Sequence, residues 1–368
     1  MPKIFELFGY PLSVQTLQAQ KCRKQAHCPF MGGPCDGGGN RYLSHVDILP
    51  KSKLQEYFGN RARVEAGVCS IQLVAGESPW IVCPRRLLIL GRESAAARAY
   101  QQATETEVLS LLGYERGTKL GVWSEVKLQF DETIGDADKS FNYTFDYIVM
   151  PVGRVSQYDL TAVLGNNWAA WRRTFERGGY TIARRAGEDF VEDCPVGVPH
   201  IIEIMTSSTS GGNKANRTTI PQSFEDALFG KEHNAPGINK RQVWARMVSQ
   251  LIVKSEVAIA WGGKALWIIQ DTLADYISAS TALDLRQFMA KHTDEVNLLS
   301  FSYGNQHTTA SDIIELRLAN LFAGPISSGG ANAAPSFQDM IRTPVCPPLK
   351  KLQVRLAESK PVNTIIVP

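Results

Sequence analysis

Hydrophobic and polar positions along the chain change their pattern near residue 115. Beyond it, segments rich in β-branched and aromatic residues alternate with helix-like segments. The stretches 120–130 and 141–149 have strand character and are separated by a polar turn at 131–140, while the apolar run Val198–Met205 is typical of a strand covered on both faces. Strand–helix alternation of this kind predicts an α/β body.

The clearest helical pattern lies at 239–256, where apolar residues recur at i, i+3 and i+4 and Asn239 stands at the capping position. The remaining elements that the pattern predicts are helices over 51–58, 93–112, 165–178 and 271–278, short strands over 68–74, 81–82, 257–261, 265–269 and 363–367, and a loop-like stretch over 324–347.

The first hundred residues are irregular instead. CPFMGGPCDGGGN (28–40) contains five glycines and two prolines, which excludes a continuous helix or strand there. Five of the chain's seven cysteines fall in this region. The region also holds 13 Lys and Arg against 7 Asp and Glu, a balance of +6, whereas the remainder has 26 against 29, a balance of −3. A segment of this composition needs a source of stability other than a large apolar core.

Composition restricts the class of protein. The chain has 368 residues, of which 44% are hydrophobic and 20% charged, so intrinsic disorder is excluded over most of its length. No run of 18 apolar residues is present, and we expect no membrane span. The first residues lack the apolar core of a signal peptide, which favours a cytoplasmic location. We therefore expect reduced thiols.

Four of the N-terminal cysteines form a candidate metal site: Cys28, Cys35, Cys69 and Cys83. Four thiolates suit a tetrahedral centre that holds zinc or iron, and such a centre organises loop-rich segments. The alternative is that these cysteines are scattered through the fold and pack as small hydrophobic residues. Cys22 and His27 are weaker candidates for the same site.

Two carboxylates lie within otherwise apolar strand-like stretches. Asp146 stands between aromatic residues, and Glu203 lies in HIIEIM. Burial of an unpartnered carboxylate is costly, and two at neighbouring strand ends would suit Mg²⁺. This is the logic of D…ExK nuclease sites, but the position of the usual lysine holds Met205. The alternative is two edge-strand acids that face solvent.

Paired basic residues stand beside predicted turns and helix starts, where they are candidates for phosphate contacts or, alternatively, ordinary solvated surface. These are Arg85–Arg86, Arg172–Arg173, Arg184–Arg185, Lys214–Arg217 and Lys240–Arg241. The polar stretch 206–219, directly after Glu203, is either a loop that lies along DNA or a plain surface loop.

Taken together, these segments resemble the NotI-like type II restriction endonucleases. The ordered set is FGYPLS, CPF, a second Cys, GVC and WIVCPRRLL in the N-terminal part, then FDY (145–147), EIMTSSTSGGNK (203–214), NKRQVWARMVSQ and KALWIIQDTLADYI. The resemblance covers most of 5–90 and 141–277. Residues 151–197 look like an insertion, and 278–368 are weakly covered. No single motif is specific, but their order is.

The resemblance implies a restriction-endonuclease-like mixed sheet flanked by helices, preceded by a loop-rich four-cysteine fold. It divides the chain into a DNA-contacting region at 1–100 and a nuclease core at 101–368. It implies structural iron, with zinc as the alternative, at the four cysteines, and catalytic Mg²⁺ at Asp146 and Glu203. Met205 replaces the family's Gln, and Lys214 stands at the offset of its Lys. The third catalytic role would then fall to Lys214 or to an acid such as Glu125 or Glu132.

The implied activity is a Mg²⁺-dependent cut of both strands of a specific DNA sequence. Metal-activated water would attack the phosphodiester and leave 5′-phosphate and 3′-hydroxyl ends. A homodimer is the simplest assembly that cuts both strands of a palindrome. Met205 keeps a second hypothesis open, in which the protein binds DNA but its nuclease core is weak or inactive. An RNA-processing nuclease is a third.

Overall fold

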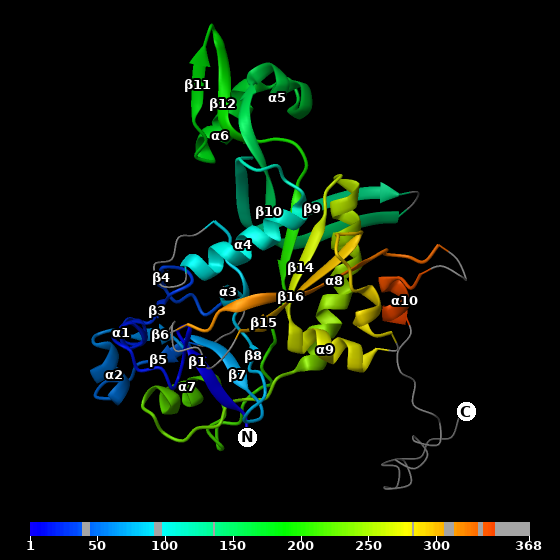
Figure 1. Cartoon of the computed structure of the whole chain (residues 1–368). Coiled ribbons are helices and arrows are strands. Elements are labelled where there is room, and N and C mark those ends of the chain that lie inside the picture. The colour runs from blue at the N-terminus through cyan, green and yellow to red at the C-terminus, as the bar shows by residue number, and fades with distance from the viewer. Residues whose placement is uncertain are drawn as a thin grey trace, which may run out of the picture.

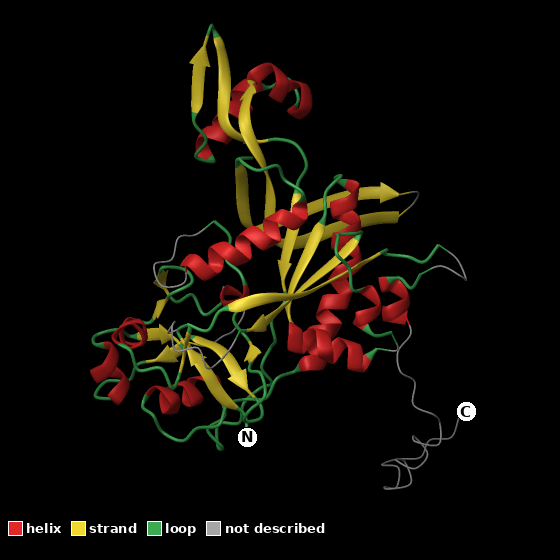
Figure 2. Cartoon of the chain, in the orientation of Figure 1, coloured by secondary structure: helices red, strands yellow, loops and turns green. Residues whose placement is uncertain are grey.

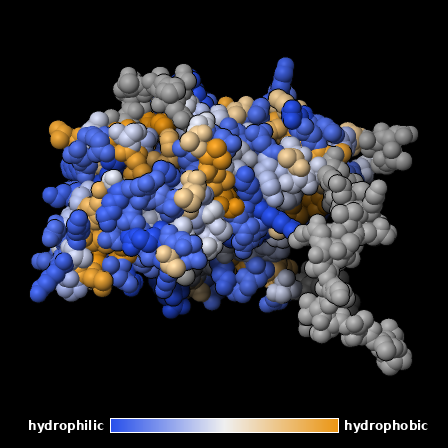
Figure 3. Space-filling model, turned by 90° about the horizontal axis from the view of Figure 1, so that it is seen from below, coloured by the Kyte–Doolittle hydropathy of each residue, from blue (hydrophilic) through white to orange (hydrophobic). Residues whose placement is uncertain are grey.

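The protein has an α/β fold, as the sequence pattern predicts, and its mixed central sheet is flanked by helices (Figures 1 and 2). The structure is a computed structural model, and it describes residues 1–38, 45–91, 98–134, 137–281, 283–304, 313–329 and 334–342. None of the helices within these ranges is long and apolar enough to cross a membrane. On the face shown in Figure 3, hydrophilic residues predominate and hydrophobic ones form scattered patches.

The central sheet has the strand order β11-β12-β10-β13-β14-β15-β16. The eighth strand, β9, also pairs with β10. Its strands are β9 (Leu120–Ile134), β10 (Ala137–Ser156), β11 (Ile182–Arg185), β12 (Glu188–Pro195), β13 (His200–Ile204), β14 (Ala265–Gln270), β15 (Val296–Tyr303) and β16 (Leu316–Gly324). β13, β14 and β15 run parallel to one another, and the other pairings are antiparallel.

Parallel strands require crossover connections, and two helices supply them. α8 (Lys240–Ala260) joins β13 to β14, and α9 (Asp271–Ser280) joins β14 to β15. Side chains alternate along β14, so that Trp267 packs in the cluster that contains residues of α8, while Ile268 packs in the cluster that contains residues of α4 (Arg98–Leu112). Both faces of the central strands are therefore covered, which explains why β13 and β14 are mostly apolar.

A smaller sheet occupies the N-terminal region with the order β2-β1-β7-β8. The elements of this region are β1 (Lys3–Leu7), β2 (Tyr10–Pro11), α1 (Leu17–Gln25), β3 (His27–Cys28), β4 (Gly33–Pro34), β5 (His45–Asp47), α2 (Lys53–Phe58), β6 (Arg63–Glu65), β7 (Val68–Gln72), β8 (Trp80–Ile81) and α3 (Pro84–Leu87). The remaining elements are α5 (Gln157–Leu164), α6 (Trp168–Arg177), α7 (Ile220–Leu228), η1 (Leu285–Phe288) and α10 (Phe337–Arg342).

A buried ion pair ties the N-terminal sheet to the central one. Arg86 of α3 and Glu6 of β1 are fully buried, and Arg86 Nη2 lies 3.1 Å from Glu6 Oε1. Ser70 of β7 and Tyr303 of β15 each donate a hydroxyl hydrogen bond of 2.8 Å to Glu6 Oε2. Arg86 also donates to the carbonyl of Ile314. One apolar cluster continues across the same junction, so the first hundred residues share a core with the rest.

Residues 157–195 form a projection that we call the arm, made of α5, α6, β11 and β12. Its small apolar cluster, centred on Leu160, Val191 and Cys194, is separate from the other clusters. β12 pairs with the C-terminal end of β10, and Figure 1 shows the arm standing away from the rest of the molecule. The arm coincides with most of the stretch, 151–197, that looks like an insertion in the sequence.

Most of the predicted elements are confirmed, but several are wrong in detail. Residues 257–261 are not a strand, because α8 continues helical to Ala260. The predicted turn at 131–140 is instead largely strand, since the β9–β10 ladder extends to the pair Ile134–Ala137. The structure also adds β3 and β4 within and beside 28–40 and α10 within 324–347, and the predicted strand at 363–367 lies outside the described residues.

The junction yields a stability prediction. Replacing Arg86 with Met leaves the Glu6 carboxylate buried without its cation, and we expect the free energy of unfolding to fall by about 3–5 kcal/mol. Arg63→Met is the control, because Arg63 pairs with Asp47 at the surface, and it should cost less than about 1 kcal/mol. Urea unfolding of both variants measures the difference. Equal effects in the two variants would contradict this account of the junction.

Candidate functional site

Asp146 and Glu203 lie directly opposite each other on adjacent strands. The β10–β13 register pairs Tyr147 with Ile202, which brings the two acids together at the next position. The backbone N–H of Asp146 donates to Glu203 Oε1 at 3.3 Å, and the N–H of Ile204 donates to Asp146 Oδ2 at 2.7 Å. Asp146 is half-buried and Glu203 is buried. The two residues that the sequence singled out therefore belong to one site.

The structure adds a lysine that the sequence reasoning missed. Lys254 of α8 donates from Nζ to Glu203 Oε2 at 2.7 Å and to the carbonyl of Thr144 at 2.8 Å. Its side chain is 2% exposed and that of Glu203 4%. Lys254 Nζ also lies 5.4 Å from the centroid of the Phe145 ring and 5.9 Å from that of the Trp267 ring. Glu203 thus has a buried cation as its partner.

Lys254 carries a sequence signal, although a weak one. It lies on the buried stripe of α8 with Met247, Leu251 and Ala258, at the i, i+3 and i+4 spacing of residues that face the core. A lysine in such a stripe needs a buried acceptor, because burial of an unpaired ammonium is costly. The sequence shows a lysine at a position where the helix pattern predicts an apolar residue. Only the packing of α8 on β13 identifies Glu203 as its partner.

Burial dominates the electrostatics of Glu203. It raises the pKa of Glu203 to about 7, with a further increase from the nearby Asp146 charge, while Lys254 opposes the shift. Near neutral pH, Glu203 is therefore balanced between its protonated and ionised forms. A second cation at this position would compete with the proton.

Met205 and Lys214 occupy different places relative to this pair. Met205 follows β13 and is half-buried against the apolar cluster that includes residues of α8. Lys214 is exposed in the loop beyond, and its backbone carbonyl accepts a hydrogen bond from Gln222. Within the described residues, no ion pair joins Lys214 to an acid. The cation beside Glu203 is Lys254, so the prediction that Lys214 fills the third role has no geometric support.

The two alternative acids also differ in position. The β9–β10 register places Glu125 opposite Asp146, and Glu125 is exposed, with a φ of 53° that interrupts the regular ladder. Glu132 pairs with Lys139, seven residues further along the ladder, or about 23 Å from Asp146 at the usual rise per residue. Glu125 remains near the site, and Glu132 does not.

The four predicted cysteine ligands gather around one small cavity of about 30 Å³. Cys28 and Cys35 come from the Gly-rich segment, Cys69 from β7 and Cys83 from the N-terminus of α3. The Cys69 and Cys83 side chains are hydrogen bonded to each other. Segments far apart in the sequence therefore bring these four thiols together, which argues against cysteines scattered through the core.

Backbone amides face the sulfur atoms. The N–H of Gly9 donates to Cys69 Sγ at 3.2 Å, and other amide hydrogen bonds reach Cys28, Cys35 and Cys83. Burial raises the pKa of Cys28 to about 12, whereas the hydrogen bond from Cys69 lowers the pKa of Cys83. Amide donors that converge on sulfur stabilise thiolates, as in metal–thiolate centres.

Within the residues that the structure describes, no group of three or more His, Cys, Asp or Glu side chains is already arranged to hold a metal ion. The four thiols line one cavity without forming such a group. Cys22 does not line this cavity; it contacts Tyr10 and Gln18 instead. His27 does not line it either, so the structure favours neither additional candidate.

The paired basic residues predicted from the sequence differ in their surroundings. Arg86 is buried against Glu6, so the prediction that Arg85–Arg86 forms a phosphate-contacting surface pair is wrong for Arg86. Arg217 pairs with Asp226, and Lys240 lies 4.4 Å from the centroid of the Trp80 ring. Of the two arginine pairs in the arm, Arg184 and Arg185 are exposed on β11, and Arg172–Arg173 is described below.

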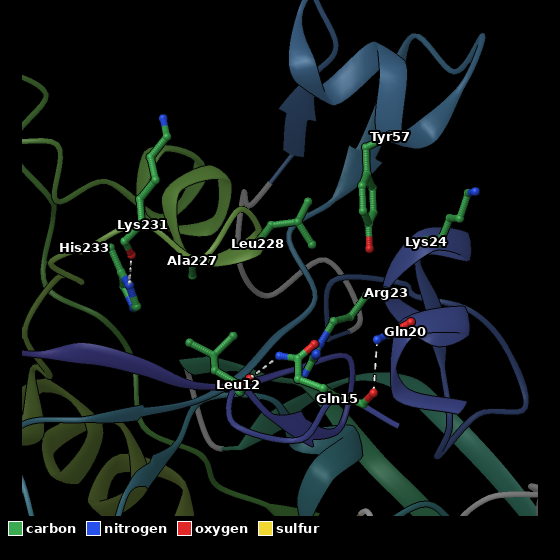
Figure 4. Close-up of a pocket in the computed structure, with 11 residues that line it drawn as sticks. Leu12, Gln15, Gln20, Arg23, Lys24, Tyr57, Ala227, Leu228, Lys231 and His233 are labelled. Carbon is green, nitrogen blue, oxygen red and sulfur yellow. Dashed lines mark hydrogen bonds between the residues drawn. The ribbon is translucent and has the colours of Figure 1, made fainter. Parts of the chain in front are cut away.

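A separate cavity of about 520 Å³ lies between α1, α2 and α7 (Figure 4). Arg23, Tyr57 and His233 are among its lining residues, and none of the predicted site residues is. Arg23 is buried and donates to the carbonyls of Val14 and Pro11, its Nε has no hydrogen-bond partner, and none of the residues that line the cavity is an acid or a cysteine. The acids and the cysteines therefore remain the best candidates for chemistry.

No family model matches the chain, and comparisons with curated proteins and with solved structures find no match.

The buried Glu203–Lys254 pair predicts a pH-dependent mutational effect. Below about pH 7, Glu203 keeps its proton, so Lys254→Met should change the free energy of unfolding little. Above pH 7, wild-type Glu203 ionises beside Lys254, whereas in the variant the raised pKa rises further and stability is lost. We expect the destabilisation to grow to about 3 kcal/mol by pH 9.

Urea unfolding at pH 6 and pH 9 measures this effect. The double variant Glu203→Gln/Lys254→Met is the control, because it removes the titrating carboxyl together with its partner. Relative to wild type, its stability should lack the steep loss above pH 7 that the single variant shows. A Lys254→Met effect of the same size at both pH values would contradict the pair.

Proposed function

We propose that the protein is a site-specific, Mg²⁺-dependent DNA endonuclease of the restriction type. The observation that carries this proposal is the convergence of Asp146, Glu203 and Lys254 at the junction of β10, β13 and α8. Two adjacent carboxylates and a lysine are the components of the D…ExK site that the sequence resembles. The lysine comes from a helix rather than from the position two residues after the glutamate.

The residues present fit a divalent cation. Asp146 and Glu203 are the two carboxylates that would hold it, because Mg²⁺ is commonly bound by one or two carboxylates together with waters and substrate phosphate oxygens. When bound, the ion lowers the pKa of a water and stabilises charge on the reacting phosphate. The raised pKa of Glu203 makes cation binding compete with a proton, so binding should strengthen as the pH rises through about 7.

Lys254 acts as a positioning residue in this proposal. Its ammonium fixes Glu203 Oε2, while Glu203 Oε1 accepts from the backbone of Asp146. This leaves the site with one net negative charge when both acids are ionised, instead of two. Hydrogen bonds from neighbouring residues to a metal-binding carboxylate orient that carboxylate, and their loss typically lowers metal affinity or activity about 10- to 100-fold.

The remaining parts of the proposal follow from the activity. The partner is double-stranded DNA, and a homodimer supplies two sites for the two strands. The four-cysteine cavity would hold a structural iron or zinc ion that braces the N-terminal region. The fit rests on four converging thiols and on the amides that face them.

The second candidate function is DNA binding without cleavage. Met205 is the feature that favours it, because Met neither binds Mg²⁺ nor activates water. Lys254 weakens this argument, since it brings a cation to Glu203 from another direction. An RNA-processing nuclease has no specific support from the geometry, and competition between RNA and duplex DNA would reveal it.

Cleavage assays separate these functions. With a long mixed-sequence DNA and Mg²⁺, we expect discrete fragments from wild type and none from Glu203→Gln. Lys254→Gln should cut about 10- to 100-fold more slowly. Met205→Leu and Lys214→Gln should stay close to wild type, because neither residue pairs with Glu203.

Circular dichroism would establish that each variant is folded. Retained DNA binding with no fragments under Mg²⁺ or Mn²⁺ would contradict nuclease function and support the second candidate. Normal cleavage by Lys254→Gln, together with inactive Lys214→Gln, would instead reverse the assignment of the lysine.

The structural metal has an independent test. Elemental analysis of purified protein should find about one iron or zinc ion per chain. Cys69→Ser and Cys83→Ser should lose the metal and unfold at lower temperature. Cys194→Ser is the matched control, because Cys194 is buried in the arm and should leave the metal content unchanged. Metal well below one per chain in carefully prepared wild type would contradict the site.

A further inference from the structure

The arm presents an arginine surface that the proposed function does not yet use. In the sequence, Arg172 and Arg173 form one basic pair, but the structure separates their roles. Arg172 forms ion pairs of 3.0 Å with Asp189 of β12 and with Glu176 of its own helix. Arg173 is exposed on α6, and its Nε donates to the carbonyl of Ala169. Only one member of the pair is therefore held by carboxylates.

Arg177 extends the surface one helical turn further. Arg173 and Arg177 are four residues apart, so they lie on the same side of α6. Both are exposed, and within the described residues neither forms an ion pair with a carboxylate. Ala170 and Thr174 lie beside them, and a shallow hollow of about 590 Å³ runs along this side of the helix. The one acid that lines the hollow, Glu176, is already paired with Arg172.

The position of the arm relates this surface to the candidate active site. β10 carries Asp146 and continues to Ser156, where the arm begins. Ten residues of strand span at most about 33 Å. One turn of B-form DNA is about 34–36 Å long. A duplex that runs along β10 from a phosphate at Asp146 and Glu203 would therefore reach the base of the arm within about one helical turn.

The architecture of the arm suits a rigid contact. The aromatic residues Trp168, Phe175 and Tyr180 pack on its separate apolar cluster, and Trp168 Nε1 donates to Asp189. The inward side of α6 is thereby fixed, while the outward side keeps two uncompensated positive charges. Arginines in such positions contact phosphates and fix the orientation of a duplex without reading its sequence.

We propose that the α6 surface formed by Arg173 and Arg177 binds the phosphate backbone of duplex DNA beyond the cleavage site. This inference rests on the proposed function, and it assigns the arm the role of holding the duplex in register. Each phosphate contact releases counterions, so the surface should contribute to the salt dependence of binding.

Fluorescence anisotropy with a labelled 30-base-pair duplex, without divalent ions, tests this inference. Each phosphate contact contributes about 0.9 to the slope of log affinity against log salt concentration. Arg173→Gln/Arg177→Gln should therefore lower the slope by about 1.8. Between 50 and 200 mM salt, wild type should lose about twelvefold more affinity than the variant does. Arg173→Lys/Arg177→Lys keeps both charges and should retain most of the slope.

The control removes two charges at the other end of the central sheet. Arg286 lies within η1 and Lys291 follows the residue that bridges to β16, whereas the arm adjoins β10 at the opposite end of the sheet. Arg286→Gln/Lys291→Gln should leave the slope within error of wild type. If wild type binds DNA and the arm variant behaves like this control, the arm inference is overturned while the nuclease proposal stands. If wild type does not bind duplex DNA, both proposals fail.

Discussion

The structure depends on a carboxylate that cannot be buried alone. Glu203 lies in the middle of a sheet covered on both faces, where water does not compensate its charge. Lys254 supplies the compensation from α8, and this requirement fixes the register of α8 against β13 and β10. Burial of Glu203 accounts both for its raised pKa and for the need for Lys254 on the buried side of α8, whereas the β10–β13 register places Asp146 beside it. A buried pair of this kind adds little net stability, but its disruption is costly.

The N-terminal region follows the same principle at a second place. Glu6 and Arg86 are buried together where the small sheet meets β15, and two hydroxyl groups complete the hydrogen bonding of Glu6. This network holds the region that carries the four cysteines against the central sheet. The basic, cysteine-rich composition of the first hundred residues is therefore not that of an independent appendage, because these residues contribute to a shared core.

The sequence predicted local features better than distant ones. The helix at 239–256 and its Asn239 cap are confirmed because periodicity and capping are local, and β13 is confirmed because an apolar run marks a covered strand. The strand predicted over 257–261 was wrong, because a short run with β-branched residues is also compatible with the end of a helix that packs on the sheet. Asp146 and Glu203 were identified from the sequence because each is an acid within an apolar strand. Lys254 was not identified as part of the site, because its partner lies 51 residues away and only tertiary packing brings the two together.

Crystals of the protein with a DNA duplex and Mn²⁺ offer the most direct test of the central claim that Asp146 and Glu203 hold a divalent ion beside Lys254. Our account predicts an anomalous-scattering peak about 2.1 Å from an oxygen of each carboxylate, with Lys254 still bonded to Glu203. A map with DNA bound and with no such peak at these carboxylates, or with the ion at a different set of acids, would contradict it.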